Sequence, residues 1–390
     1  MNYDSIDIYE LWLGLKLSSA RRCTQLIGEY GNAKTVFENI ESVRASHRNI
    51  ITDTVYDSLC SETPEALHER LRRSVVKLKI DVIMKSHAEY PKLLKQCDDS
   101  PSVLFVRGRL PKDDVHTVGI VGTRNYSSYG AEVTDAYAHS ICKYGGVTVS
   151  GLAMGIDTVV AKSSLRASDN ECATVAVLGS GIDIPTPDDN AKLYYSVIER
   201  GAVVSQFAPG VHATRYTYPM RNKVIAGMSE VLIVTEAGER SGALITARAA
   251  INYNRKVYCV PGRMVDASYA GSNALLQNRE AEHIPDVENF YRKVFLGKEG
   301  TQNTLFDERR TVISSENKPK VSAEKEQMSK TGLDEAEEKI YNALKQGEKS
   351  FEELCSIIDI SAPQMNLKLT MMELSGIIVQ MPGRIYKLHI

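Results

Sequence analysis

The stretch TVGIVGTRNYSSYGAEVTDAYAHSICKYGGVTVSG, Thr117 to Gly151, carries the pattern that decides the fold. It opens with a short apolar run, passes through a turn, continues with helical spacing and ends in a second β-branched run. A strand, a crossover helix and another strand in this order form a βαβ unit, whose two strands lie parallel in one sheet. The stretch therefore predicts an α/β fold.

The same alternation continues on both sides of this stretch, across residues 81–296. Further β-branched runs are DVIM (81–84), VLFVRG (103–108), TVAVLGSG (174–181), AVVSQ (202–206), EVLIVTEA (230–237) and KVYCVPG (256–262). Segments long enough to be crossover helices separate several of them. This pattern predicts an extended Rossmann-like domain, with a doubly wound and mostly parallel sheet that helices cover on both faces.

Three other segments flank this domain in the sequence. Residues 1–80 read as short amphipathic helices, one of them beginning after Ser18 or Ser19 and ending at Gly31, and predict a small SAM-like or helix-hairpin-helix-like domain. Residues 297–330 are polar and aperiodic, which predicts a linker. Residues 331–390 show three helical patterns and two short strands, the order of a winged helix.

Composition limits the classes of function. The net charge of this 390-residue chain is −2, so nucleic-acid binding requires a local basic surface. Seven widely spaced cysteines without a CxxC pair favour buried thiols in a reducing cytoplasm, and we expect no disulfide framework, no metal site and no cofactor. The N-terminus lacks a basic region before its apolar residues, and no long apolar segment follows. We expect a cytoplasmic protein that does not bind membranes.

Three turns that contain glycine come directly after predicted strands. Their candidate phosphate-binding residues are Gly122, Arg124 and Ser127 in the first, Ser150, Gly151 and Gly155 in the second, and Gly179 and Gly181 in the third. The carboxyl ends of parallel strands share one sheet edge, where helix N-termini present N–H groups to anions. Each glycine taken alone is explained equally well by a tight turn. Their clustering with Arg124 favours a phosphate-binding edge.

The stretch YTYPMRNKVIAGMSEVLIVTEAGERSGALITA (216–247) supplies further candidates. Arg221, Asn222 and Lys223 lie near a helix start, and we expect the two cations to project toward the same sheet edge as the glycine turns. Ser241 and Gly242 open the next helix. Arginine, serine and helix N-termini together are typical of phosphate binding. The alternative for the two cations is a solvated helix end, or an ion pair with Glu230 or Glu236. Tyr216 and Tyr218 are candidates for base stacking, although packing under the loop explains them equally well.

The chain shows no familiar catalytic pattern. It has no Walker motif, no GxSxG, no HExxH and no GxGxxG with a suitably placed acid, and none of its eight histidines lies beside a paired acid in such a motif. Asp157 and Asp183 follow glycine turns and are candidate acids, but an aspartate at a helix start is more often an N-cap. The sequence suits the holding of phosphates better than their cleavage.

At this point the residues carry a family resemblance. The blocks GIVGTRNYSSYG (119–130), SGLAMGIDTVVAKSSL (150–165), RNKVIAGMS (221–229) and SGALITA (241–247), in this order, resemble the DNA-processing protein A (DprA, also Smf) family. The three-part organisation also matches that family. The resemblance implies a non-enzymatic, homodimeric protein that binds single-stranded DNA, protects incoming DNA and loads the RecA recombinase onto it during natural transformation.

The resemblance also assigns DNA-contacting positions. They are Arg124 with its turn, the Arg221, Asn222 and Lys223 run, and Ser241 with Gly242. The chain departs from the family at two places. Ala161 stands where the family usually has a histidine after GIDT, and Gln206 and Ala208 stand in a stretch that usually resembles SEYPPG and contains a glutamate. These departures weaken an ancestral catalytic role, but they remove no phosphate donor.

The predicted winged helix has the wrong charge for duplex DNA. Residues 331–390 contain six Lys and Arg against nine Asp and Glu, and the only cation of the expected recognition helix, 361–376, is Lys368. A helix that enters a major groove should bring several phosphate-neutralising residues. We therefore expect a protein-interaction or regulatory module, with most of Met365, Leu369, Met372 and Leu374 in its core.

Three other interpretations compete with this one. PMRNKVI followed by EAGERSGAL distantly resembles the lysine-decarboxylase-like (LOG) nucleotide phosphoribohydrolases, which makes a nucleotide-binding enzyme the main alternative. Those enzymes carry a Gly-Gly-x-Gly-Thr turn and then a catalytic Glu, which this chain lacks. A winged-helix transcriptional regulator that senses a nucleotide is disfavoured by the acidic C-terminal segment. A purely structural scaffold leaves the clustered turns unexplained.

Overall fold

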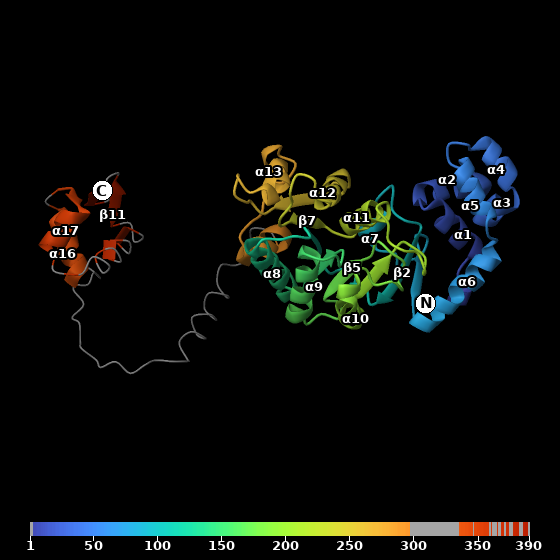
Figure 1. The fold of residues 1–390 in the computed structure, drawn as a ribbon, viewed down its shortest axis with the longest axis horizontal. Helices are drawn as coiled ribbons and strands as arrows, with labels where there is room; N and C mark the ends of the chain where they lie inside the picture. The colour runs from blue at the N-terminus through green and yellow to red at the C-terminus, as the bar shows by residue number, and fades with distance from the viewer. Residues whose placement is uncertain are drawn as a thin grey trace. The chain divides into compact units, whose positions relative to one another are not determined.

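The computed structural model describes residues 3–296, 335–345, 347–358, 360, 365, 368–369, 372–373, 377–381 and 385–388. These residues form two compact units, one within Met1–Thr301 and one within Gln302–Ile390 (Figure 1). In this described part of the chain, no helix has the length and apolar character needed to cross a bilayer.

The first unit begins with a cluster of helices. They are α1 (Ile8–Leu17), α2 (Ala20–Tyr30), α3 (Ala33–Glu38), α4 (Ile40–Ser46), α5 (Asp53–Cys60) and α6 (Pro64–Leu78). The expected limits of α2 are confirmed, with Ser19 as the N-cap and Gly31 as the C-cap. One apolar cluster joins Trp12 of α1 and Leu71 of α6 to Phe105 of the sheet, so the helices pack directly on the α/β part.

A nine-stranded sheet forms the centre of this unit, in the order β1-β2-β6-β5-β4-β3-β7-β8-β9. The strands are β1 (Asp81–Met84), β2 (Val103–Gly108), β3 (Thr117–Val121), β4 (Val147–Ser150), β5 (Thr174–Val177), β6 (Ala202–Ser205), β7 (Val231–Val234), β8 (Lys256–Cys259) and β9 (Glu282–His283). Every neighbouring pair from β6 to β9 is parallel. β2 pairs antiparallel with β6 and with β1. The prediction of a mostly parallel Rossmann-like sheet is confirmed.

Helices cover both faces of this sheet (Figure 1). One face carries α8 (Ser128–Lys143), α9 (Ile156–Ala167), α10 (Ala191–Arg200) and α14 (Val287–Tyr291), followed by a π-helical turn (Arg292–Leu296); the other carries α7 (Lys92–Lys95), α11 (Thr217–Gly227) and α12 (Ala243–Asn252). α13 (Ala270–Gln277) lies beside β8. Two separate apolar clusters, one on each side of β3, hold these layers together.

The order of the strands creates a divergence at β3. This strand pairs in parallel with β4 on one side and with β7 on the other. The connection after β3 leads through α8 to β4, and the connection after β7 leads through α12 to β8 on the other side of the sheet. The loops after β3 and β7 therefore diverge at the carboxyl edge. Such topological switch points are where open α/β sheets bind their ligands.

The second unit has the elements of a winged helix. They are α16 (Glu335–Leu344), β10 (Lys349–Ser350), α17 (Phe351–Ile357), β11 (Ile378–Met381) and β12 (Ile385–Leu388), with the strands in the order β10-β12-β11. Ser350 and Glu353 form a capping box at the start of α17. Met365, Leu369 and Met372 are buried, as expected. Leu374, most of residues 361–376 and the predicted linker 297–330 lie outside the described residues.

Candidate nucleic-acid interface

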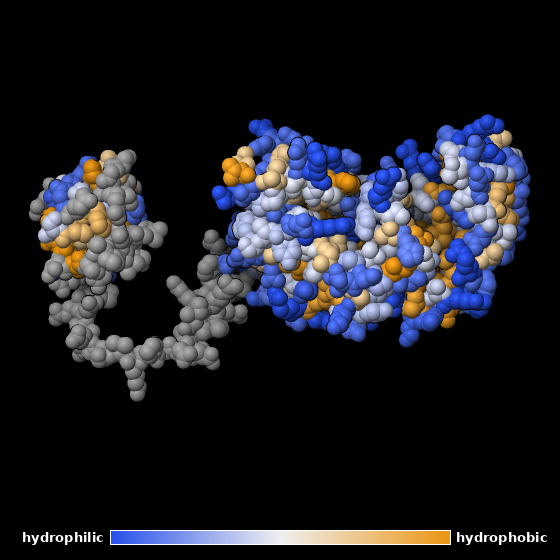
Figure 2. Space-filling view, viewed as in Figure 1, coloured by the Kyte–Doolittle hydropathy of each residue, from blue (hydrophilic) through white to orange (hydrophobic). Residues whose placement is uncertain are grey.

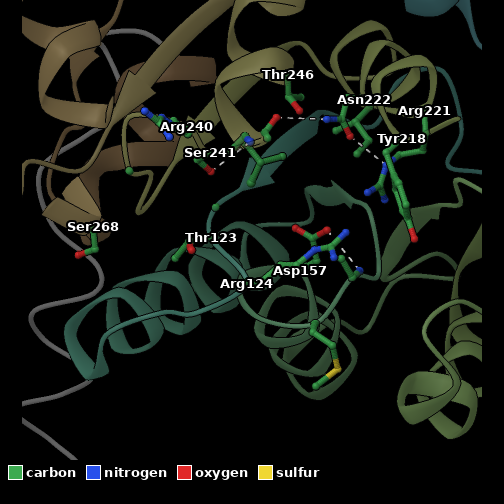
Figure 3. Close-up of a pocket in the computed structure, with 18 residues that line it drawn as sticks. Thr123, Arg124, Asp157, Tyr218, Arg221, Asn222, Arg240, Ser241, Thr246 and Ser268 are labelled. Atoms are coloured by element: carbon green, nitrogen blue, oxygen red, sulfur yellow. Dashed lines mark hydrogen bonds between the residues drawn. The ribbon is translucent and has the colours of Figure 1, made fainter. Parts of the chain in front are cut away.

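A cavity of about 500 Å³ lies at the switch point. The turns after β3, β4 and β7 border it, together with the N-terminal parts of α11 and α12. Its polar and aromatic lining consists of Thr123, Arg124, Asp157, Tyr218, Arg221, Asn222, Arg240, Ser241, Thr246 and Ser268 (Figure 3). In Figure 3, Asn222 and Thr246 face Arg124 and Asp157 across this space. We call it the switch-point pocket.

Arg221 is the buried cation of the switch-point pocket, with 5% of its surface exposed. Its guanidinium donates hydrogen bonds to the backbone carbonyls of Gly151 and Val177, the latter at 2.8 Å, and to Asn222 Oδ1 at 3.0 Å. A Cβ at Gly151 would stand 1.7 Å from Nη1 of Arg221, so only glycine permits this approach. Burial lowers the pKa of Arg221, while the nearby Asp157 carboxylate favours the charged form.

Asp157 is the only acidic residue among the described residues that line the switch-point pocket. Burial raises the pKa of its carboxyl group, and Arg221 opposes that shift. The expected N-cap role is wrong, because Gly155 is the N-cap of α9 and the Asp157 carboxylate accepts from the Ala153 N–H at 3.3 Å. The same expectation is wrong for Asp183, which lies in a turn and accepts from the Gly210 N–H at 2.9 Å.

Arg124 and Tyr218 form the more open side of the switch-point pocket. The Arg124 guanidinium lies 5.3 Å from the centroid of the Tyr218 ring, and the Arg221 guanidinium lies 5.7 Å from the same centroid. Arg124 is exposed, and no ion pair neutralises it within the described ranges. Tyr216, the other predicted stacking residue, is 66% exposed and lies against Arg215 outside the pocket. The Tyr218 ring thus lies close to two cations.

The turn that begins α12 borders the switch-point pocket. Gly242 is the N-cap, and its carbonyl accepts from Asn222 Nδ2 at 3.2 Å. Ser241, Gly242 and Thr246 all line the cavity. The N–H groups of Ala243, Leu244 and Ile245 donate to the Ser241 hydroxyl and to the carbonyls of Ser241 and Gly242. The Gly242 N–H has no hydrogen-bond partner within the described residues, so this turn offers an anion one N–H group and the positive end of the helix dipole. The predicted residues Ser241 and Gly242 therefore do lie at this cavity.

Sequence reasoning missed several lining residues. Arg240 is exposed and adds a third cation to the pocket. Its position directly before the predicted residue Ser241, in the turn after β7, could have identified it from the sequence. Thr123 adjoins Arg124 in the same way. Ser268 comes from the loop before α13, far along the chain, and no local pattern connects it with the other turns.

Two predicted serines use their hydroxyl groups inside the protein. Ser127 caps α8 by accepting from the Gly130 N–H at 3.0 Å, and it donates to Glu236 at 2.9 Å. Ser150 is buried and donates to the Ile120 carbonyl at 2.8 Å. Neither serine lines the switch-point pocket.

The remaining predicted glycines contribute close packing. Gly155 has a φ of +93°, and a Cβ there would lie 2.4 Å from the Thr123 carbonyl oxygen, so this glycine lets two turns of the edge meet. Gly179 lies against the Tyr218 ring, and Gly181 lies against the Ala208 carbonyl. Of the glycines predicted to bind phosphate, Gly122 and Gly242 line the switch-point pocket.

Lys223 lies outside the switch-point pocket. Its Nζ is 2.6 Å from Oδ2 of Asp99, and its side chain is half exposed. The expectation that Arg221 and Lys223 share one edge is wrong, because positions two apart on a helix point in very different directions. The alternative partners, Glu230 and Glu236, are also wrong.

Glu236 links two borders of the switch-point pocket. It is completely buried just after β7, and its Oε2 accepts from the Ser127 N–H and hydroxyl at 2.9 Å each and from the Tyr269 hydroxyl at 3.4 Å. Ser127 belongs to the turn that carries Arg124, and Tyr269 follows Ser268. Its Oε1 has no hydrogen-bond partner within the described residues. Glu236 therefore positions lining residues without lining the cavity itself.

The comparisons with known proteins agree with this geometry. Residues 81–295 match the family of DNA recombination-mediator protein A, and residues 324–384 match the DprA winged helix domain. The chain belongs to the DprA family. The resemblance seen in the sequence is thereby confirmed, as is the winged helix. Membership of the DprA family places the chain among the DNA-processing and recombination-mediator proteins.

Individual relatives show how far the similarity extends. DNA processing protein DprA of Bacillus subtilis is 35% identical over 216 residues, which cover 55% of this chain and 71% of that protein. The X-ray structure of DprA from Streptococcus pneumoniae has a TM-score of 0.56 and 27% identity, covering 74% of this chain and 98% of that one. A structure of DNA processing protein A from Helicobacter pylori, which describes its single-stranded DNA binding mode, has a TM-score of 0.50 and 24% identity. The match covers 56% of this chain and 97% of that one.

Proposed function

We propose that this protein binds single-stranded DNA at the switch-point pocket, without catalysis, as a recombination mediator. The observation that carries the proposal is the convergence of Arg124, Arg221, Arg240 and the N-terminus of α12 on one cavity. Cations and helix N–H groups together are the donors that phosphodiesters need. The single-stranded DNA binding of the Helicobacter pylori protein supports the choice of ligand.

Each group has a distinct part in the proposed binding. Arg124 and Arg240 are exposed and neutralise phosphates, which releases counterions and makes the affinity dependent on salt. Arg221 is buried and contributes a fixed positive field. The Gly242 N–H and the Ser241 hydroxyl donate to a phosphate oxygen, and the positive end of the α12 dipole favours the phosphate charge. Because these contacts go to the backbone, the binding carries little sequence preference.

The Tyr218 ring gives the pocket a surface for a base. It lies close to the guanidinium groups of Arg124 and Arg221, and stacking on an aromatic ring tolerates any base. Bases are available for stacking in a single strand but not in an intact duplex. The proposed site therefore prefers single-stranded to duplex DNA.

The wider role in the proposal rests on the family resemblance. In that role a cytoplasmic homodimer coats and protects incoming DNA and loads the RecA recombinase onto it during natural transformation. The winged helix then serves as a protein-interaction or regulatory module. Lys368, the one cation of residues 361–376, has its Nζ 3.4 Å from Glu337, which supports that assignment.

A binding experiment with a charge-matched control tests the proposal. We expect labelled oligo-dT to bind tightly in fluorescence anisotropy and a duplex of equal length to bind weakly. The Arg124→Gln/Arg240→Gln variant should bind oligo-dT more weakly, and its salt slope should be shallower by about 1.4, because two phosphate contacts are lost. Arg48→Gln/Lys143→Gln removes two exposed charges outside the pocket and should leave both quantities unchanged.

Two outcomes would contradict the proposal. Weak binding of both DNAs by the wild-type protein would remove the DNA site. Release of free base from nucleoside monophosphates by the purified protein would favour the phosphoribohydrolase interpretation.

A further inference from the structure

A second cavity, of about 770 Å³, has no part in the function described above. We call it the α12 flank cavity. The loop after α7, the C-terminal half of α12 and the turn that follows this helix border it. Its charged lining residues are Asp98, Asp99, Lys223, Arg248 and Arg255, and Cys97 and Tyr253 also line it.

Helices α11 and α12 connect this cavity with the switch-point pocket. Ser241 and Thr246 of the α12 segment line the pocket, whereas Arg248 and Asn252 line the flank cavity. α12 has 10 residues, so its two ends are about 15 Å apart. Figure 2 shows hydrophilic residues around a small apolar patch over α12. A chain of phosphates that leaves the pocket along α12 reaches the flank cavity within the length of this helix.

The charges of the flank cavity are unevenly compensated. Lys223 is paired with Asp99, which also accepts from the Tyr253 hydroxyl. Burial opposes ionisation of Asp99, but the hydrogen bonds from Lys223 and Tyr253 hold its pKa below the usual value. These contacts leave the charge of Asp99 and that of Lys223 balanced against each other.

The two arginines of the flank cavity have no acidic partner in the described part of the chain. Arg255 donates to the Leu93 carbonyl at 3.0 Å and to the Gln96 side-chain oxygen at 3.4 Å, and its Nε is buried without a hydrogen-bond partner. Arg248 is exposed, and no residue that the structure describes forms an ion pair with it. Asp98, also exposed, offsets one of these two charges. An excess of positive charge remains, and an anion would satisfy it.

We infer that the α12 flank cavity binds a second phosphate of the same DNA single strand, through Arg248 and Arg255. The inference rests on the proposed function of the switch-point pocket, and it extends the binding path along α12. Ile245, which is 41% exposed and lines the flank cavity, lies on the helix just before Arg248 and offers an apolar contact to a sugar or base on this path.

Oligonucleotide length separates the two subsites. The experiment measures anisotropy with oligo-dT of about 4 and of about 16 nucleotides, lengths that span common single-strand site sizes. For Arg248→Gln/Arg255→Gln we expect unchanged affinity for the short strand. Affinity for the long strand should fall about tenfold at moderate salt, with a salt slope shallower by about 1.4. Arg48→Gln/Lys143→Gln is again the control and should bind both strands like the wild type.

Other outcomes overturn the inference in distinguishable ways. Equal weakening of both strands would mean that the two arginines act on the switch-point pocket, and no weakening would mean that the flank cavity is not on the path. Either result leaves the proposed function intact, whereas a wild-type protein that binds neither strand removes both. Because Arg255 also holds the Leu93 carbonyl, the single Arg248→Gln variant is measured in parallel. Arg248 makes no hydrogen bond or ion pair within the described residues, so this substitution removes no internal contact. The inference requires that it also weakens binding of the long strand, as the double variant does.

Discussion

Arg221 shows how a cation is kept charged inside the switch-point pocket. Removal from water costs a charged group several kcal/mol unless partners replace the lost hydration. Here two carbonyls, the Asn222 side chain and the field of Asp157 replace it. Gly151 makes this possible, because its carbonyl accepts from Arg221 and its missing side chain leaves room for the guanidinium.

Gly151→Ala should therefore damage stability and DNA binding together. The added methyl group would stand 1.7 Å from Nη1 of Arg221 and 2.6 Å from Oδ2 of Asp157, so the buried pair must move. Overpacking of this kind costs about 1–3 kcal/mol, which urea unfolding measures, and anisotropy should show weaker binding of oligo-dT. The control is Gly28→Ala in α2, where a Cβ meets nothing within 4 Å. That change should leave DNA binding unaltered, and equal losses in both variants would refute the role of Gly151.

At the scale of elements, β7 carries a carboxylate beyond each end. Glu230 precedes the strand and pairs with His116 at 2.9 Å, at the amino edge of the sheet. Glu236 follows the strand and holds the turn after β3 and the loop before α13 at the carboxyl edge. Each carboxylate accepts hydrogen bonds from a backbone N–H and from a side chain of another element. Only Glu236 contacts elements that border the switch-point pocket.

This arrangement predicts different consequences for two similar substitutions. Glu236→Ala and Glu230→Ala should each lower the free energy of unfolding by about 1–3 kcal/mol, because each leaves donors without an acceptor. Only Glu236→Ala should also weaken binding of oligo-dT at a temperature where both variants are folded, since the turn that carries Arg124 loses its anchor. If both variants bound oligo-dT like the wild type, Glu236 would have no positioning role.

Local sequence patterns predicted most elements, and what they missed depends on contacts between distant residues. Apolar periodicity identified β1 to β8, because each is a short buried run beside a turn. It did not identify α4 and α5, which are short, nor the antiparallel pairing of β2, which depends on neighbours far along the chain. At the site, the turns were predictable from their glycines. The outward direction of Lys223 and the arrival of Ser268 follow from tertiary packing.

At the scale of the whole molecule, all residues of the switch-point pocket and the α12 flank cavity belong to the first unit. The second unit has its own apolar core, built from α16, α17 and the three-stranded sheet. Residues 331–390 carry a net charge of −3, counted from the sequence. A negative module of this kind repels a DNA backbone, so the proposed binding of DNA needs no contribution from it.

Removal of the second unit should therefore leave single-strand binding intact. A protein that ends at Thr301 keeps the first compact unit and both cavities, so its affinity and salt slope for oligo-dT should equal those of the full chain in anisotropy. The isolated segment 331–390 should not bind duplex DNA at moderate salt, because its expected recognition helix offers only Lys368 and that cation is paired with Glu337. Duplex binding by this segment would make the winged helix a DNA reader. A large loss of single-strand affinity on truncation would show that the second unit completes the binding path, and the site would then have to be sought across both units.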